Sequence, residues 1–478
     1  MDRNRLFREI PKVDILLERE EIRELEQEYG HAEVMNAIRH RLDHLREMIR
    51  QEDEERAEQE MHKLVPEICR QVREQAMPSF RKVVNATGTI LHTNLGRAPL
   101  SRAHAQKLAE LMSGYSNLEY DLETGERGER YSHISSLLCR LTGAEDALVV
   151  NNNAAAALLI LDTIAKEKEV IVSRGELVEI GGSFRIPEIL KTCGAFLSEV
   201  GTTNKTRLSD YERAVTEKTA AILKVHTSNY RIVGFTESVP VRELRRLGDR
   251  YDLPVIEDLG SGVLTDLTRF GAEPEPLVQE EIRSGADLVC FSGDKLLGGA
   301  QAGIILGKKC YIDRLKKNPL TRALRVDKFT VGALELVLRE YLKKDEVFGR
   351  IPVLQMISET EESCQKRAQS FLHLLEGVSD DLELDVRHCK SQVGGGALPT
   401  TSLPGYAVTA ASRTMSADAL QERMRKAEVP VIGRIVEDRI YMDIRTIRED
   451  EYPLVKECLQ QAVGQKSDKG QAAGQKRR

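Results

Sequence analysis

Between residues 146 and 310, short apolar segments alternate with amphipathic ones, and this alternation constrains the fold more than any other feature. Strands that alternate with helices form a mainly parallel, doubly wound α/β sheet. Ligands of such sheets bind outside the carboxyl ends of the strands, so polar residues there are candidates for function. We expect strands at Val170–Ser173, Phe196–Val200, Ala221–Val225, Val255–Glu257, Leu288–Phe291 and Gly303–Leu306, and helices at Tyr211–Thr216, Val241–Tyr251 and Pro276–Ser284.

A lysine follows one of these strand ends, in Ser292-Gly-Asp294-Lys295-Leu-Leu-Gly-Gly. Burial at such a turn lowers the pKa of a lysine and frees its amine as a nucleophile, which suits a Schiff base with pyridoxal phosphate (PLP). Ser292 could donate its hydroxyl to the cofactor phosphate. An ordinary surface lysine in a Gly-rich turn is the alternative for this motif taken alone.

A carboxylate at a second strand end favours the cofactor. Asp258 ends the apolar run Leu253-Pro-Val-Ile-Glu-Asp and lies 37 residues before Lys295. An Asp behind the PLP ring keeps the pyridine nitrogen protonated, which makes the cofactor an electron sink. A strand-end Asp, a helix and strand, and then a strand-end Lys is the order of fold type I PLP enzymes.

The segment Asp146-Ala-Leu-Val-Val-Asn-Asn152-Asn153-Ala-Ala-Ala-Ala is expected to form a strand, a turn and a helix. Free N–H groups and the dipole at a helix start favour an anion, so we assign the cofactor phosphate to Asn152 and Asn153. These residues could equally cap the helix, and the two roles can coexist.

Three further segments are weaker candidates. The loop Gly201-Thr202-Thr203-Asn-Lys follows a strand, and Arg97 lies in a Gly-containing polar segment. Arg322 and Arg325 would share one face if their segment is helical, and could then bind a phosphate-like anion. A solvated basic face is the alternative for that segment.

The two ends of the chain differ from this central region. Residues 1 to about 75 have helical spacing and are expected to form two or three helices, but 14 Lys and Arg face 20 Asp and Glu over residues 1–80. Either a packing arm or RNA binding through local clusters around Arg39 or Lys12 fits this composition. A smaller α/β domain is expected over about 335–465, followed by a disordered basic tail.

Bulk properties exclude several classes of protein. No apolar run approaches about 18 residues and the start lacks the apolar core of a signal peptide, so we expect a cytoplasmic protein. The 8 cysteines form no Cys-x-x-Cys pair, so neither a metal site nor a disulfide framework is expected, and the thiols should be reduced and mostly buried. The net charge of −6 indicates neither DNA nor a membrane as partner.

The chain closely resembles the bacterial selenocysteine synthases, the L-seryl-tRNA(Sec) selenium transferases. The resemblance covers nearly the whole chain and rests on these motifs: Asn85-Ala-Thr-Gly, His92-Thr-Asn-Leu-Gly-Arg97, Arg174-Gly-Glu-Leu-Val-Glu-Ile-Gly-Gly-Ser-Phe-Arg185, Val200-Gly-Thr-Thr-Asn-Lys and Ser292-Gly-Asp-Lys-Leu-Leu-Gly-Gly-Ala-Gln-Ala-Gly303.

The resemblance implies a fold type I PLP enzyme that converts L-seryl-tRNA(Sec) to L-selenocysteyl-tRNA(Sec) with selenophosphate. The β-hydroxyl of serine is eliminated and selenium adds to an aminoacrylyl-tRNA intermediate. The implied assembly is a homodecamer of five dimers, with active sites at dimer interfaces. The implied regions are a tRNA-binding helical domain (1–78), a PLP-binding domain (79–334), a small α/β domain (335–464) and the tail (465–478).

The resemblance also implies roles for individual residues. Lys295 carries the cofactor, and Asp258 and Asp294 are catalytic. The residues implied to bind the substrates are Arg97, Arg322 and Arg325 for the selenium-donor anion, and Thr202 and Thr203 in the lining of the site.

Two alternatives remain from the residues. A PLP lyase acting on a small phosphorylated amino sugar would share the lysine region but would not need the N-terminal helices. A tRNA-binding scaffold with an inactive PLP fold would be expected to lose Asp258 and Lys295, and both are present.

Overall fold

The structure is a computed structural model that describes residues 3–51, 54–182, 184–394 and 396–464. Its contacts divide the chain into two units, one up to Lys82 and one from Val83 onward. We describe each unit by itself. In the described residues, no helix combines the length and the apolar character that crossing a membrane requires.

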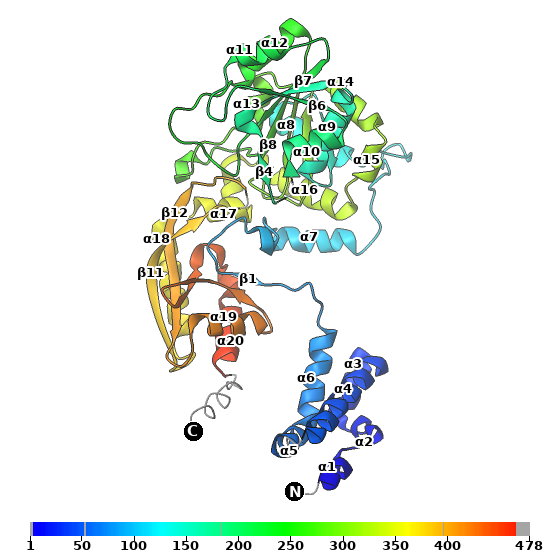
Figure 1. The fold of residues 1–478 in the computed structure, drawn as a ribbon, viewed down its shortest axis with the longest axis vertical. Coiled ribbons are helices and arrows are strands. Elements are labelled where there is room, and N and C mark those ends of the chain that lie inside the picture. The colour runs from blue at the N-terminus through cyan, green and yellow to red at the C-terminus, as the bar shows by residue number, and fades with distance from the viewer. Residues whose placement is uncertain (1–2, 52–53, 183, 395, 465–478) are drawn as a thin grey trace. The chain divides into compact units, whose positions relative to one another are not determined.

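The first unit is helical, and its longest helix organises it (Figure 1). The helix α4 buries Val34, Ile38 and Leu42 along one face, and these pack with residues of α3 and α6 in a small core of their own. The chain breaks into more helices than the two or three predicted, because the positive φ of Gly30 separates α3 from α4. The described helices are α1 (Arg3–Glu9), α2 (Val13–Leu17), α3 (Glu20–Tyr29), α4 (His31–Arg50), α5 (Glu54–His62) and α6 (Leu64–Ala76).

A 7-stranded sheet forms the centre of the second unit, in the order β2-β10-β9-β8-β7-β3-β6. All neighbours are parallel except β10, which runs antiparallel to both β2 and β9. The predicted doubly wound sheet is thereby confirmed. Its strands are β2 (Asp146–Val150), β3 (Glu169–Ser173), β6 (Phe196–Val200), β7 (Thr219–Val225), β8 (Val255–Gly260), β9 (Leu288–Ser292) and β10 (Gly303–Gly307).

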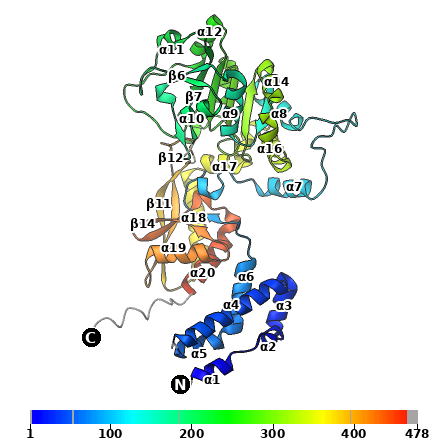
Figure 2. The same ribbon diagram turned by 45° about the vertical axis from the view of Figure 1, so that its right-hand side comes forward.

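Helices cover both faces of this sheet (Figures 1 and 2). Two separate apolar clusters, one on each face, explain why the central strands are apolar along their whole length. One cluster includes α9 (Asn153–Ala165), α10 (Ile186–Thr192) and α14 (Lys309–Lys317). The other includes α8 (Ser132–Thr142), α12 (Val241–Tyr251), α13 (Val278–Arg283), α16 (Lys328–Tyr341) and α17 (Pro352–Ser358). The remaining elements of this region are α7 (Arg102–Met112), α11 (Leu208–Ala214), α15 (Leu320–Ala323), β4 (Glu179–Ile180) and β5 (Phe184–Arg185).

A second, antiparallel sheet with its own core follows in the order β11-β12-β15-β14. Figure 1 shows its long strands β11 and β12 beside α18. The start of the unit returns to this region, because β1 pairs with β13 in parallel. The elements are β1 (Val84–Asn85), β11 (Leu382–Gln392), β12 (Ser402–Ser412), β13 (Val431–Ile432), β14 (Arg434–Val436), β15 (Arg439–Asp443), α18 (Glu361–Leu375), α19 (Ala417–Lys426) and α20 (Tyr452–Gly464).

The start of β10, at Gly303, meets the turn after β2 so closely that a glycine is needed there. Gly303 pairs with Val150 on one side and Ser292 on the other, so β10 brings the carboxyl ends of β2 and β9 to one edge of the sheet. A Cβ atom on Gly303 would lie 2.1 Å from the carbonyl oxygen of Asn152.

We therefore expect Gly303→Ala to lower the free energy of unfolding by about 1–3 kcal/mol, because the turn at Asn152 must move. Thermal unfolding of the purified variant measures this. Gly349→Ala is the matched control, because a Cβ atom there has no neighbour within 4 Å and the glycine does not have a positive φ. Equal melting temperatures for the two variants would contradict the close approach.

Candidate active site

Lys295 lies in a buried turn directly after β9. The turn is closed by hydrogen bonds from Gly293 N to Ala302 O and from Gly298 N to Lys295 O, each 2.9 Å long. Only 3% of Lys295 is exposed, so the alternative of an ordinary surface lysine is wrong. Burial lowers the pKa of its ammonium and the Arg97 guanidinium lowers it further, while nearby carboxylates oppose the shift. The site thus favours the neutral, nucleophilic amine.

Asp258 is buried on the neighbouring strand β8, with 3% of the residue exposed. Its Oδ1 accepts hydrogen bonds from Asn153 Nδ2 (2.8 Å) and Gly260 N (2.9 Å). Burial raises the pKa of this carboxyl, and the two hydrogen bonds act in the opposite direction by favouring the carboxylate. The hydrogen bond from Asn153 also fixes the position of the carboxylate relative to the start of α9.

Asn152 and Asn153 lie where the sequence predicted a helix start. Asn152 is the N-cap of α9, and its Oδ1 accepts a hydrogen bond from Ala155 N at 2.8 Å. Asn153 is the first helical residue and reaches Asp258. The start of α9 and its unpaired N–H groups therefore lie at the edge of the sheet where β8 and β9 end.

Arg97 and Asp294 form an ion pair next to the lysine. The distance from Arg97 Nη1 to Asp294 Oδ2 is 3.0 Å, and Asp294 is 6% exposed. The backbone joins the same two segments, since Ala98 N donates to Asp294 O. The structure thus brings Arg97 from the polar segment before α7 to the turn that carries Lys295, while Ser292 is the buried last residue of β9.

Near this cluster lie buried polar atoms that have no hydrogen-bond partner among the residues that the structure describes. Among them are Asn153 Oδ1, Ser228 Oγ, Asn229 Oδ1 and His92 Nδ1. A Cβ atom on Gly396 would lie 3.4 Å from Lys295 Nζ and 3.9 Å from Asn229 Cβ, so these groups are close neighbours. Unsatisfied buried polar groups are costly and indicate a missing partner. An amine, a carboxylate, a helix start and unsatisfied polar atoms together fit PLP.

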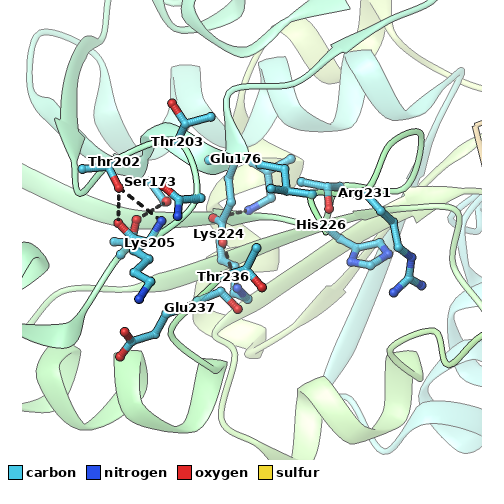
Figure 3. A pocket seen from close by; sticks show the side chains of 17 residues that line it. Ser173, Glu176, Thr202, Thr203, Lys205, Lys224, His226, Arg231, Thr236 and Glu237 are labelled. Atoms are coloured by element: carbon cyan, nitrogen blue, oxygen red, sulfur yellow. Dashed lines mark hydrogen bonds and ion pairs between the residues drawn. The ribbon is translucent and has the colours of Figure 1, made fainter. Parts of the chain in front are cut away.

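Thr202 and Thr203 line a separate hollow, which we call the threonine hollow (Figure 3). It has a volume of about 360 Å³ and also includes Lys205, His226, Arg231 and Thr236. Glu176 and Lys224 form an ion pair of 2.9 Å in its lining. Lys295 is not among the lining residues, so within one chain the two threonines and the lysine do not share this hollow.

Arg322 and Arg325 line another hollow, of about 310 Å³, which we call the basic hollow. Its remaining lining residues are Tyr131, Lys316, Lys317, Asn318, Pro319 and Thr321. The sequence placed both arginines on one helix face only if their segment is helical throughout, and that condition is not met. The helix α15 ends at Ala323, and Arg325 instead forms an antiparallel bridge with Val150 of β2. Neither Lys295 nor Arg97 lines this hollow.

One buried carboxylate near the site escaped prediction. Glu275 Oε2 contacts His226 Nε2 at 3.0 Å and Ser261 Oγ at 3.2 Å, and its side chain is 3% exposed. His226 directly follows β7, and its backbone N–H donates to Asp258 O. Glu275 itself lies between two prolines in an irregular segment, where no strand-end pattern could identify it.

Comparison with known proteins agrees with this arrangement. The family model described as L-seryl-tRNA selenium transferase matches residues 83–448, and one described as selenocysteine synthase N terminal matches residues 7–46. Two similar proteins are the L-seryl-tRNA(Sec) selenium transferases of Alkaliphilus oremlandii and Geobacter sulfurreducens. The first is 46% identical, covering 97% of this chain and 100% of its own, and the second is 48% identical, covering 95% and 99%.

Among solved structures, D-glucosaminate-6-phosphate ammonia-lyase superposes with a TM-score of 0.55 and 20% identity, covering 82% of this chain and 98% of its own. This likeness supports the fold alone. The predicted fold class is confirmed: a fold type I sheet with a smaller C-terminal α/β region and an N-terminal helical region. The extent and identity of the sequence matches confirm the predicted resemblance, and the chain belongs to the L-seryl-tRNA selenium transferase family.

Proposed function

We propose that this protein is a PLP-dependent enzyme that converts L-seryl-tRNA(Sec) to L-selenocysteyl-tRNA(Sec), with selenophosphate as selenium donor. The observation that carries the proposal is the buried, neutral-favouring amine of Lys295 at the same sheet edge as the Asp258–Asn153 pair. Membership of the family supports the choice of substrate. We place the enzyme in the cytoplasm.

The residues that would hold the cofactor follow from the site. Lys295 would bind the aldehyde carbon, Asp258 the pyridine nitrogen, and the start of α9 with Asn152, Asn153 and Ser292 the phosphate. When bound, PLP supplies an electron sink that stabilises negative charge on the Cα atom of the seryl group.

The side chains of the chain then move the protons. The amine of Lys295 is buried and its pKa is lowered, so it is able to accept the Cα proton of the bound serine. Arg97 pairs with Asp294 beside this amine, and its positive charge adds to the effect of burial in lowering the pKa of the amine. The β-hydroxyl leaves as water, the selenium of selenophosphate adds at Cβ, and hydrolysis of its Se–P bond releases phosphate.

For the donor, we propose that Arg97, Arg322 and Arg325 gather the selenophosphate anion, because guanidinium groups bind such oxyanions bidentately. Arg97 contacts Asp294, whereas the other two arginines line the basic hollow. A second copy of the chain that supplies one of these groups would complete the site. We therefore propose a homo-oligomer with sites at dimer interfaces, assembled as a decamer of five dimers, with Thr202 and Thr203 lining the site.

For the tRNA, we propose that the N-terminal helical region binds it. The proposed division is 1–78 for this domain, 79–334 for the PLP-binding domain and 335–464 for the small domain; the tail, 465–478, lies outside the described residues. Several arginines of the helical region are engaged internally, as Arg46 is with Asp43 at 2.7 Å. Arg39 is exposed and has no ion-pair partner in the described part of the unit.

A PLP lyase acting on a phosphorylated amino sugar is the second candidate, and the fold of D-glucosaminate-6-phosphate ammonia-lyase is the observation that favours it. The helical unit before Val83 counts against it, since a small-molecule lyase has no need of an RNA-binding arm.

The purified protein should absorb near about 420 nm, as expected of PLP bound to a lysine amine. The spectrum should change on addition of seryl-tRNA(Sec) but not of a different seryl-tRNA. Lys295→Ala should abolish both the band and turnover. A yellow protein that ignores both tRNAs would support the small-molecule lyase, and a colourless one would refute the role of Lys295.

Protein from which the cofactor has been removed should bind added PLP at a rate that rises with pH. The midpoint of this rise should lie below 10.5, the ordinary pKa of lysine, because the pKa of Lys295 is lowered. Arg97→Ala should move the midpoint to higher pH, because it removes a positive charge and leaves Asp294 unpaired. Stopped-flow absorbance measures the rate. Arg97→Lys keeps the charge and is the matched control; an unchanged midpoint in Arg97→Ala would contradict the electrostatic role.

Arg39→Ala should raise the KM for seryl-tRNA(Sec) by about five-fold, because one phosphate contact is lost. The slope of log KM against log salt concentration should fall by about 1. The KM for selenophosphate should not change. Steady-state rates over a range of salt concentrations measure both. Arg46→Ala is the matched control, since Asp43 already engages Arg46. Equal effects of the two variants would argue against tRNA binding at Arg39.

A further inference from the structure

The backbone at Arg325 is fixed on two sides. Arg325 bridges to Val150 of β2, and Asn151 N donates to Leu324 O at 3.0 Å. On the other side, Arg130 Nη1 donates to the carbonyl oxygen of Val326. The position of the Arg325 Cα atom is therefore determined, and only the direction of its long side chain remains open.

Glu119 is the acidic side chain that contacts this guanidinium in the described residues. Arg325 Nη1 donates to Glu119 Oε1 at 3.4 Å, and the two side chains are 35% and 30% exposed. The contact engages one of the nitrogens of Arg325 and leaves the others available to an anion. Arg322, which lines the same basic hollow, is exposed and has no ion-pair partner among the described residues.

Glu119 is itself held in place by Arg130. Arg130 donates to Glu119 Oε1 through Nε (3.1 Å) and Nη2 (2.8 Å), and its side chain is only 13% exposed. Arg130 thus links the carboxylate to the backbone beside Arg325. The hydrogen bond from Arg130 lowers the pKa of Glu119, so the carboxylate stays charged. Arg127 contacts the other oxygen at 3.6 Å but is 81% exposed.

Tyr131, the residue after Arg130, shows that the Glu119–Arg130 pair lies beside the basic hollow. Tyr131 lines the basic hollow, and its buried hydroxyl oxygen has no hydrogen-bond partner in the described residues. Arg130 and Tyr131 are adjacent, so the loop that carries Glu119 ends at the wall of the hollow. A phosphate-type anion in the hollow would meet the free nitrogens of Arg325.

We infer that Glu119 is a positioning residue for the selenium donor: held by Arg130, it directs the Arg325 guanidinium into the basic hollow. The inference rests on the proposed function, which assigns Arg325 to the donor anion. Glu119 acts through Arg325 and does not itself contact the donor, because its carboxylate would repel a phosphate.

The test is steady-state kinetics of the holoenzyme with seryl-tRNA(Sec) and selenophosphate. Glu119→Ala should raise the KM for selenophosphate roughly two- to five-fold, the effect of one partly exposed ion pair. The kcat and the KM for seryl-tRNA(Sec) should stay within about two-fold, because the positioned arginine binds only the donor. Glu119→Gln, which keeps an acceptor oxygen, should recover part of the loss.

A binding readout and a control complete the test. Calorimetric titration with inorganic phosphate should show the same loss of affinity in Glu119→Ala without any turnover. Glu123→Ala is the matched control: it removes the same charge from the same loop, and its carboxylate contacts no arginine in the described residues. If Glu119→Ala does not fold, as judged by thermal unfolding, Glu119→Gln carries the comparison.

Double variants separate the inference from the proposed function. Arg325→Ala should raise the KM for selenophosphate, and adding Glu119→Ala should raise it no further, because both remove the same interaction. Additive effects, or a wild-type KM in Glu119→Ala beside a raised one in Arg325→Ala, would overturn the inference alone. A wild-type KM in Arg325→Ala would overturn the donor role of Arg325 together with the inference.

Discussion

The hydrogen bond from the Asn153 amide to the Asp258 carboxylate is the interaction on which the site depends. It joins the start of a helix to a neighbouring strand end, and it partly offsets the cost of burying the carboxylate. The antiparallel strand β10 makes it possible, because Gly303 brings the ends of β2 and β9 together. The start of α9, the Asp258 carboxylate and Lys295 are therefore placed by one sheet edge.

Much of this arrangement could be predicted because it depends on short sequence patterns. Apolar runs bounded by turn residues gave the central strands, and β6 (Phe196–Val200) has the predicted bounds. Lys295, Asp258 and Asn153 were identifiable because each follows or ends such a run. The Asn152 cap of α9 was equally visible in the sequence.

What could not be predicted depends on long-range contacts. The segment of Arg322 and Arg325 has helical spacing, yet pairing with β2 ends the helix before Arg325. Glu275 is brought to His226 by an irregular segment, and Glu119 reaches Arg325 across 206 positions of the sequence. Side chains that act through such contacts carry no local signal, since an exposed Glu in a polar loop is ordinary.

The pairing of β1 with β13 has a consequence for the order of synthesis. The helical unit closes its core with contacts among its own residues, so it can fold as soon as it leaves the ribosome. Val84 has to wait for Val431, which is synthesised long after it. A chain cut short before Val431 would therefore have a formed helical unit and an incompletely folded second unit, exposed to proteases and chaperones.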